Sequence, residues 1–377
     1  MDTTLVVFFS YGVSVREWIE SGLFSREVEI YDRLAKIGVK TIFVTYGNET
    51  DNDYLQNYPD LRALPLYSRI KPSSSRWLTV AQSFLIPILF RKELASASLF
   101  KTNQVWGSWA AVAAKWMLGK KLIVRGGYEP YTFLRDSGAS SIKRITMYVV
   151  CRVVYHSADI VEMATEEDRR TLQVRFGLTR RQIRVEPNVI DTCAFRPVNC
   201  VRGDVDRVLM VGRLDRQKNY KLALQALSGT NLSVTIVGDG TCRGEVETLA
   251  DQLEVKVEFL GRVNNRALAE IYRNHSIYVM SSLFEGNPKT LLEAMSTGLA
   301  VVGTDVPGIN NLIRNRQNGL LTPLKPESLR NAILELTDSG ELRRRLGSEA
   351  RKFVVANNSL DSRVLREREF LDSFERS

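Results

Sequence analysis

The chain of 377 residues carries 52 Lys and Arg against 43 Asp and Glu, a net charge of +9, and 44% of its residues are hydrophobic. This length and composition predict two globular domains, each able to bury its own core, and exclude a disordered chain. Two histidines exclude a multi-histidine metal centre, and four cysteines without C-x-x-C spacing indicate neither a disulfide framework nor a zinc site. The apolar run at residues 5–9 is too short for a signal peptide, so we expect a cytoplasmic protein.

The positive charge is concentrated in the first half of the chain. Residues 61–160 hold 15 Lys and Arg against 4 Asp and Glu, whereas residues 191–377 hold 26 against 24. Such a basic segment favours an anionic partner, which could be nucleic acid, anionic lipid or a phosphorylated substrate. The sequence has no basic-aromatic ribonucleoprotein pattern, zinc-finger spacing or basic zipper, so we expect no nucleic-acid partner.

The first half reads as five strands, at residues 5–10, 40–47, 98–103, 121–127 and 158–165, with helices between them. Asp51 and Asp53 form a D-x-D pair, but the surrounding polar residues favour a solvated loop over a metal site. Residues 76–92 are apolar, bracketed by cations and too short to span a bilayer. They form either a buried or interdomain helix or, together with the basic-apolar segment 143–156, a peripheral membrane contact.

The second half alternates apolar strands with amphipathic helices. We expect strands at 207–212, 233–240, 255–261, 277–282 and 299–304, with helices at 219–229, 243–253 and 266–274. This order predicts an α/β fold with a parallel, doubly wound sheet, whose ligands bind where the strands end. The loop-like stretch 186–199 and the charged helical tail complete the division: a first Rossmann-like domain at 1–190, a second at 191–361, and a C-terminal helix at 362–377.

The stretch FEGNPKTLLEAMSTG, at residues 284–298, places two glutamates eight positions apart around the predicted start of a helix. Pro288 suits the first turn of that helix, where its missing N–H is no loss. The free backbone N–H groups of residues 286–290 then form an anion site, with Glu285 on one side of a bound phosphate and Glu293 on the other. The structural alternative is a capped surface helix with two solvated acids.

Two other loops follow strands of the same predicted sheet. Arg213 and Lys218 lie in GRLDRQKN, where two cations can contact a diphosphate and Gly212 lets the backbone approach closely; the alternative is a pair of solvated charges. Asp239 lies between Gly238 and Gly240, but the position of the next glycine does not fit the G-x-G-x-x-G dinucleotide pattern.

Taken in order, GRLDRQKN, VGDG, EFLGRV and SSLFEGNPKTLLEAMSTGLAVVGTDVPGINNLI resemble the retaining nucleotide-sugar glycosyltransferases of the GT-B fold, in family 4. The resemblance covers about residues 156–325, and the two glutamates match that family's E-x₇-E motif. It implies two Rossmann-like domains facing a cleft, and a last helix, at 362–377, that crosses back to the first domain. It also implies transfer of a sugar from a UDP- or GDP-sugar to a glycan or lipid-linked acceptor in cell-surface polysaccharide synthesis. No metal or other cofactor would be required.

The resemblance also implies roles for individual residues. Arg213 and Lys218 would bind the donor diphosphate, Glu285 the transferred sugar and Glu293 the ribose hydroxyls. The remaining donor-binding residues would be those of the glycine loops, the base contact and the helix start: Gly12, Gly212, Gly238, Asp239, Arg262, Val263, Gly286, Asn287, Pro288, Lys289 and Thr290.

One position departs from the family. Its members often carry a histidine beside the sugar after the fourth strand of the first domain, where this chain reads VRGGYEP. Arg125, Tyr128 and Glu129 are therefore the candidates on the acceptor side. Two other functions stay open: a nucleotide-sugar epimerase on the same fold, and a non-catalytic nucleotide-sugar-binding scaffold.

Overall fold

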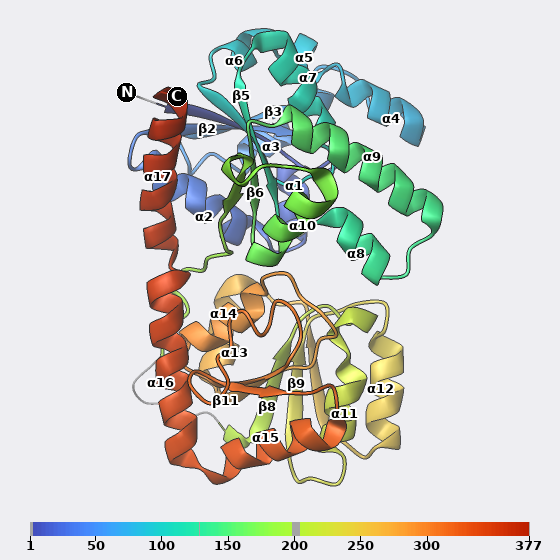
Figure 1. The fold of residues 1–377 in the computed structure, drawn as a ribbon, viewed down its shortest axis with the longest axis vertical. Helices are drawn as coiled ribbons and strands as arrows, with labels where there is room; N and C mark the ends of the chain where they lie inside the picture. The colour runs from blue at the N-terminus through green and yellow to red at the C-terminus, as the bar shows by residue number, and fades with distance from the viewer. Residues whose placement is uncertain (1–2, 128, 198–203, 377) are drawn as a thin grey trace. The chain divides into compact units, whose positions relative to one another are not determined.

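The computed structural model describes residues 3–127, 129–197 and 204–376. The chain divides into two compact units, one formed by Met1–Pro187 with Val364–Ser377 and the other by Asn188–Arg363. Each unit is a parallel sheet with helices on both faces (Figure 1). The divisions lie close to the boundaries expected at 190/191 and 361/362.

The sheet of the first unit has the strand order β3-β2-β1-β4-β5-β6-β7, and every described pairing in it is parallel. The chain therefore builds outward from β1 to β3, returns to β4 beside β1, and builds outward again, which is the doubly wound order. Two strands were not predicted, β3 and β7, because both are short and neither contains a continuous apolar run. The strands are β1 (Thr3–Phe8), β2 (Val39–Thr45), β3 (Leu61–Pro65), β4 (Leu99–Thr102), β5 (Lys121–Gly126), β6 (Ile160–Met163) and β7 (Ile183–Val185).

Helices cover both faces of this sheet, and a large apolar core lies on the side of α5, α7 and α9. The segment 76–92 is not one continuous helix, although both interpretations of the sequence, a buried or interdomain helix and a peripheral membrane contact, were stated for the whole segment. It breaks into α4, α5 and α6, and Trp77 on α4 is 86% exposed. The described helices of the unit are α1 (Val15–Glu20), α2 (Phe24–Ala35), α3 (Thr50–Asp53), α4 (Arg76–Ser83), α5 (Ile86–Leu89), α6 (Arg91–Ala95), α7 (Trp109–Leu118), α8 (Pro130–Asp136), α9 (Ser141–Ser157) and α10 (Glu166–Phe176), with short 3₁₀ turns η1 (Leu66–Ser68) and η2 (Arg180–Gln182).

A buried ionic network fastens the last helix, α17 (Leu360–Arg376), to the first sheet. The Lys101 ammonium on β4 lies 2.5 Å from Glu367 of α17 and 3.2 Å from Glu162 of β6. Arg184 on β7 reaches the same two carboxylates, at 2.8 and 3.2 Å. Buried charges are tolerated only when they are paired in this way, so removing one of these residues would leave an uncompensated charge beneath the docked helix.

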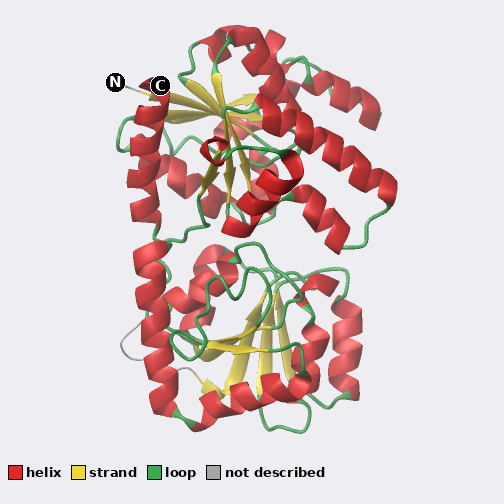
Figure 2. Cartoon of the chain, viewed as in Figure 1, coloured by secondary structure: helices red, strands yellow, loops and turns green. Residues whose placement is uncertain are grey.

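The second unit repeats the doubly wound order as β10-β9-β8-β11-β12-β13, and its described pairings are again parallel. The short strand β13 was not predicted. Figure 2 shows the helices packed around this sheet. Its elements are β8 (Asp204–Val211), η3 (Arg216–Lys218), α11 (Tyr220–Leu227), β9 (Ser233–Val237), α12 (Arg243–Gln252), β10 (Val257–Gly261), α13 (Asn265–Arg273), β11 (His275–Met280), α14 (Lys289–Ser296), β12 (Ala300–Thr304), β13 (Leu320–Thr322), α15 (Pro326–Asp338) and α16 (Gly340–Asn357).

Candidate functional site

The strand order of the second unit defines a crevice between β8 and β11. These strands are neighbours in the sheet, yet the chain leaves β8 toward β9 and leaves β11 toward β12, on the opposite side. Doubly wound sheets bind their ligands at such a switch in strand order, at the carboxyl edge of the sheet. Both candidate motifs from the sequence lie in these two loops.

The centre of the crevice is an ion pair between those loops. The Lys218 ammonium at the end of η3 lies 2.6 Å from Oε1 of Glu285, and both side chains are mostly buried, with 15% and 7% exposed. The Ser282 hydroxyl donates to the same carboxylate oxygen at 2.6 Å. A cation and a carboxylate are thus held together at the strand ends, where a ligand can contact both.

Gln217 joins the two loops, a role that sequence reasoning missed. Its side-chain amide donates to the carbonyl of Phe284 at 2.9 Å and to Oε2 of Glu285 at 3.4 Å. The backbone carbonyl of Gln217 accepts from the Leu283 N–H at 2.8 Å. Gln217 therefore holds the Glu285 loop against the Lys218 loop. The only sequence signal was its place beside Lys218.

Helix α14 begins directly after this loop and has no side chain capping its N-terminus, since Pro288 occupies the cap position. The N–H groups of its first turn, from Lys289 on, lack helical acceptors, and they lie at the positive end of the helix dipole. Asn287 fixes the approach to the helix: its side-chain oxygen accepts from the N–H of Asn188 at 2.9 Å, and its carbonyl accepts from the Asn188 amide at 2.7 Å. An anion is favoured at such a helix end.

Glu293 differs from the expectation of an open ribose contact. It is fully buried on α14, and its Oε2 lies 3.1 Å from the Tyr272 hydroxyl. Tyr278, which bonds Thr290 at 3.1 Å, lies in the same buried cluster, and desolvation raises the pKa of its phenol well above the usual value. A covered carboxylate offers no surface to a ligand, so a ribose contact requires movement that uncovers it.

Two glycines are needed because backbone passes close to them. A Cβ on Gly238, which has φ +133°, would lie 2.0 Å from the carbonyl oxygen of Gly212. A Cβ on Gly308, at φ +84°, would lie 2.2 Å from the carbonyl oxygen of Glu285. Gly308 was not among the predicted site residues, although the Pro-Gly dipeptide was a turn signal. Any side chain there would displace the Glu285 loop.

The other predicted donor residues lie on loops at the same edge of the sheet. Arg213 is 74% exposed and lies 3.3 Å from Asp215. Asp239 is partly exposed and its carboxylate accepts from the Gly240 N–H at 2.8 Å. Arg262 is exposed, whereas Val263 is partly buried against the core. Lys218 and Glu285 are charged candidates that contact each other directly.

The first-unit candidates have structural partners of their own. Gly12 follows β1 with φ +79° and is exposed. Arg125 lies 3.5 Å from the buried Glu162. Glu129 caps α8 by accepting from the N–H groups of Tyr131 and Thr132, at 3.0 and 2.6 Å. Tyr128 lies outside the described residues.

Asp51 corrects the expectation of a solvated D-x-D loop. Its side chain is fully buried, accepts from the Thr45 hydroxyl at 2.5 Å and lies 3.3 Å from the Arg16 N–H at the start of α1. Burial raises the pKa of this carboxyl above its ordinary value. Within the described residues no three His, Cys, Asp or Glu side chains cluster as metal ligands would.

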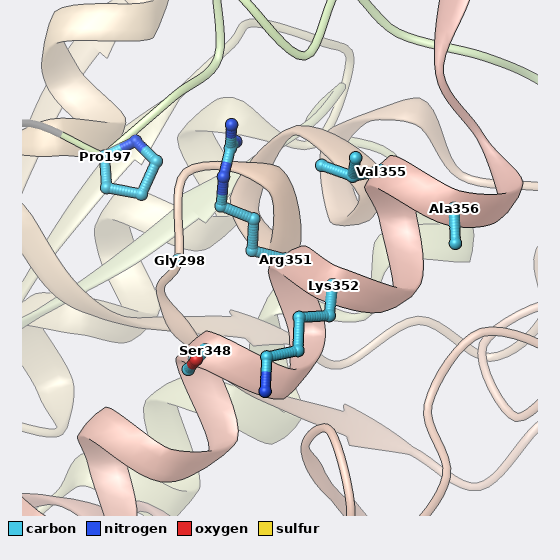
Figure 3. A pocket seen from close by; sticks show the side chains of 8 residues that line it. Pro197, Gly298, Ser348, Arg351, Lys352, Val355 and Ala356 are labelled. Atoms are coloured by element: carbon cyan, nitrogen blue, oxygen red, sulfur yellow. The ribbon is translucent and has the colours of Figure 1, made fainter. Parts of the chain in front are cut away.

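A hollow of about 600 Å³ lies at the other end of α14 (Figure 3). Gly298, Gly347 and Arg351 line it. The Arg351 guanidinium donates to the carbonyl of Ser296 at 2.5 Å, and it also contacts the carbonyl of Phe195 at 3.2 Å. Because the Arg351 guanidinium already donates to backbone carbonyls, the hollow is not part of the candidate site.

Comparison with known proteins agrees with the fold, and a family match falls in the second unit. Residues 194–353 match the family Glycosyl transferases group 1. A curated relative from Escherichia coli, UDP-Gal:alpha-D-GlcNAc-diphosphoundecaprenol alpha-1,3-galactosyltransferase, is 33% identical over 195 residues, which cover 46% of this chain and 49% of the relative. The matches span between 39% and 60% of the length of the first curated relatives.

Solved structures extend the likeness to the whole chain. Sucrose-phosphate synthase from Thermosynechococcus elongatus superposes with a TM-score of 0.81 at 19% identity, covering 99% of both chains. Anabaena HepE in complex with UDP and glucose gives 0.74 at 16% identity, covering 98% of this chain and 100% of HepE. The fold is therefore GT-B, and residues 194–353 are similar to group 1 glycosyltransferases.

Proposed function

We propose that this protein is a retaining glycosyltransferase of family 4 that moves a sugar from a nucleotide-diphosphate sugar to an acceptor hydroxyl. The observation that carries the proposal is the Lys218–Glu285 pair at 2.6 Å, set in the β8/β11 crevice beside the uncapped N-terminus of α14. The family match of residues 194–353 and the UDP bound to the similar HepE structure support a nucleotide-sugar donor.

The chemistry follows from charge. Breaking the sugar–phosphate bond develops positive charge on the sugar and negative charge on the leaving diphosphate. Three positive groups stabilise the leaving group: Lys218, Arg213 and the N-terminus of α14. Because they are already in position, they need not reorganise during the reaction. These groups supply the needed positive charge without a metal ion.

Glu285 orients the sugar rather than attacking it. Both Lys218 and Ser282 hold its Oε1 at 2.6 Å, and Gln217 approaches Oε2 at 3.4 Å. A carboxylate with engaged lone pairs is a weak nucleophile but a well-fixed hydrogen-bond acceptor for sugar hydroxyls. Retention then proceeds by attack on the face that the diphosphate leaves, with the diphosphate accepting the proton of the acceptor hydroxyl.

A lipid-linked glycan is the proposed acceptor, used at the cytoplasmic face of a membrane. The Escherichia coli relative is named for a diphosphoundecaprenol-linked acceptor. The basic first half of this chain, with 15 Lys and Arg against 4 acids in residues 61–160, complements an acceptor that carries a diphosphate.

A transfer assay tests this proposal. The protein is incubated with UDP- and GDP-sugars and either a prenyl-diphosphate-linked sugar or a free glycan, with and without EDTA. We expect an α-linked product from an α-linked donor, seen by NMR, on the lipid-linked acceptor and undiminished by EDTA. Nucleotide binding without transfer to any acceptor would favour a scaffold, and interconversion of the donor sugar alone would favour an epimerase.

A further inference from the structure

Exposed apolar side chains gather on one part of the first unit. Of the 22 large hydrophobic residues exposed in the described chain, 12 lie between residues 77 and 153. On α9 they form a stripe of Ile142, Ile145, Val149 and Val153, which are 79%, 64%, 54% and 50% exposed. This spacing puts all four on one side of the helix, facing solvent instead of the core.

Helix α4 and its continuation add bulkier groups. Trp77 is 86% exposed, Leu78 is 58% exposed, and Ile88 on α5 is 59% exposed. The Ser83 hydroxyl at the end of α4 accepts from the Trp109 indole N–H at 2.7 Å, so α4 is tied to α7, which in turn packs against both α5 and α9. Figure 1 shows α4 and α9 on the side of the unit away from α2 and α17. We call α4, α5 and the solvent side of α9 the α4–α9 face.

The charge on this face has one sign. Helices α4, α5, α7 and α9 contain no Asp or Glu. On α9, Lys143 and Arg152 are exposed beside the apolar stripe, and Lys71 is exposed just before α4. Cations flanking tryptophan and aliphatic side chains are typical of helices that lie in the interface of an anionic bilayer.

We propose that the α4–α9 face binds the surface of an anionic lipid bilayer. Trp77, Leu78 and the α9 stripe would enter the headgroup boundary, while Lys143 and Arg152 contact lipid phosphates. No helix among the described residues could cross a bilayer, so this contact is peripheral. A second copy of this chain fits the face less well, because a symmetric dimer would oppose one basic surface to another. The proposal is independent of the donor chemistry.

Vesicle flotation of the full chain tests it. The vesicles are made of neutral phosphatidylcholine alone or with 30% phosphatidylglycerol, about the anionic content needed for a clear charge effect. We expect binding to the anionic vesicles, loss of most binding at high salt, and a blue shift of tryptophan emission. All five tryptophans, Trp18, Trp77, Trp106, Trp109 and Trp116, lie in the first unit, so the shift reports this unit.

Two variants locate the contact. We expect Ile142→Ser/Ile145→Ser/Val149→Ser and Lys143→Glu/Arg152→Glu each to reduce binding to anionic vesicles by roughly tenfold or more. The matched controls change exposed residues on helices of mixed charge, Val355→Ser/Leu365→Ser, and reverse charges in the second unit, Lys221→Glu/Lys256→Glu. Both controls should bind as the parent does. Circular dichroism, together with the emission of the five tryptophans of the first unit in the absence of vesicles, verifies that every variant is folded.

Three results would overturn the proposal. The first is no binding of the parent chain to anionic vesicles, and the second is equal binding to neutral ones. The third is unchanged binding by both α9 variants. Concentration-dependent dimerisation that the apolar variant abolishes, without vesicle binding, would assign the face to a second copy. If the parent chain bound none of UDP, GDP, ADP and CMP, the proposed function would be contradicted and the vesicle result would stay intact.

Discussion

The two sheets share one topology but use their charged residues differently. In the second unit the crevice beside the first strand holds Lys218 and Glu285 at the carboxyl edge of the sheet, where they are 15% and 7% exposed. In the first unit the sheet directs Lys101 and Glu162 under α17, where they are 4% and 1% exposed. The same doubly wound order therefore places a charged pair at a candidate ligand site in one unit and a buried ionic network beneath a helix in the other.

The largest effect should come from removing the carboxylate of the second-unit pair. Glu285→Gln should lower transfer by about a hundredfold or more, the scale for losing one preorganised transition-state contact. UDP binding should persist or tighten, because Lys218 no longer has a competing carboxylate. Steady-state transfer and calorimetry measure the two effects separately. Glu270→Gln, an exposed change on α13, is the control, and full transfer by Glu285→Gln would disprove the assigned role.

Removing a carboxylate from the buried ionic network of the first unit should lower the free energy of unfolding. Glu367→Ala leaves Lys101 and Arg184 without a buried carboxylate that lies 2.5 and 2.8 Å away, and should cost about 3 to 5 kcal/mol. Urea unfolding followed by tryptophan emission isolates this unit, because every tryptophan belongs to it. Glu369→Ala, exposed on the same helix, should change stability little. Equal effects from the two changes would mean that the network contributes nothing specific.

A smaller loss of transfer is expected from changing Gln217, which lies in the loop after β8 and positions Glu285 in the loop after β11. Gln217→Ala should reduce kcat by roughly fivefold to tenfold, about the value of one or two neutral hydrogen bonds, while the Kd for UDP stays unchanged. Gln217→Glu should not restore activity, because a carboxylate cannot donate to Phe284. The exposed Gln252→Ala is the matched control. A rise in the UDP Kd with unchanged kcat would place Gln217 on the donor instead of on Glu285.

The sequence correctly predicted features that are determined by residues close together in the chain. Apolar runs located most strands, and Pro288 correctly indicated the start of α14. Loop motifs after β8 and β11 placed Lys218 and Glu285 at one edge, since all parallel strands of a sheet end on the same side. The fold class followed from the same alternation of strands and helices.

Features that depend on tertiary packing could not be predicted. Asp51 stood among polar residues, yet the fold buries it against Thr45 and the start of α1. Arg125 and Glu129 were candidates for an acceptor, but pairing with Glu162 and helix capping engage them. Glu293 had the right spacing but lies beneath Tyr272. For Asp51, Arg125 and Glu293 a partner distant in sequence decides whether the charge faces a ligand or the core.

The most direct test of the central claim is calorimetric titration with UDP, GDP, ADP and CMP, with and without EDTA. The parent chain should bind one nucleotide diphosphate with micromolar affinity that EDTA leaves unchanged. Lys218→Ala should weaken that binding by roughly tenfold to a hundredfold, the value of a charge-assisted hydrogen bond, whereas Lys221→Ala on α11 should not. Binding of no nucleotide, or equal binding by Lys218→Ala, would contradict a donor site in the β8/β11 crevice.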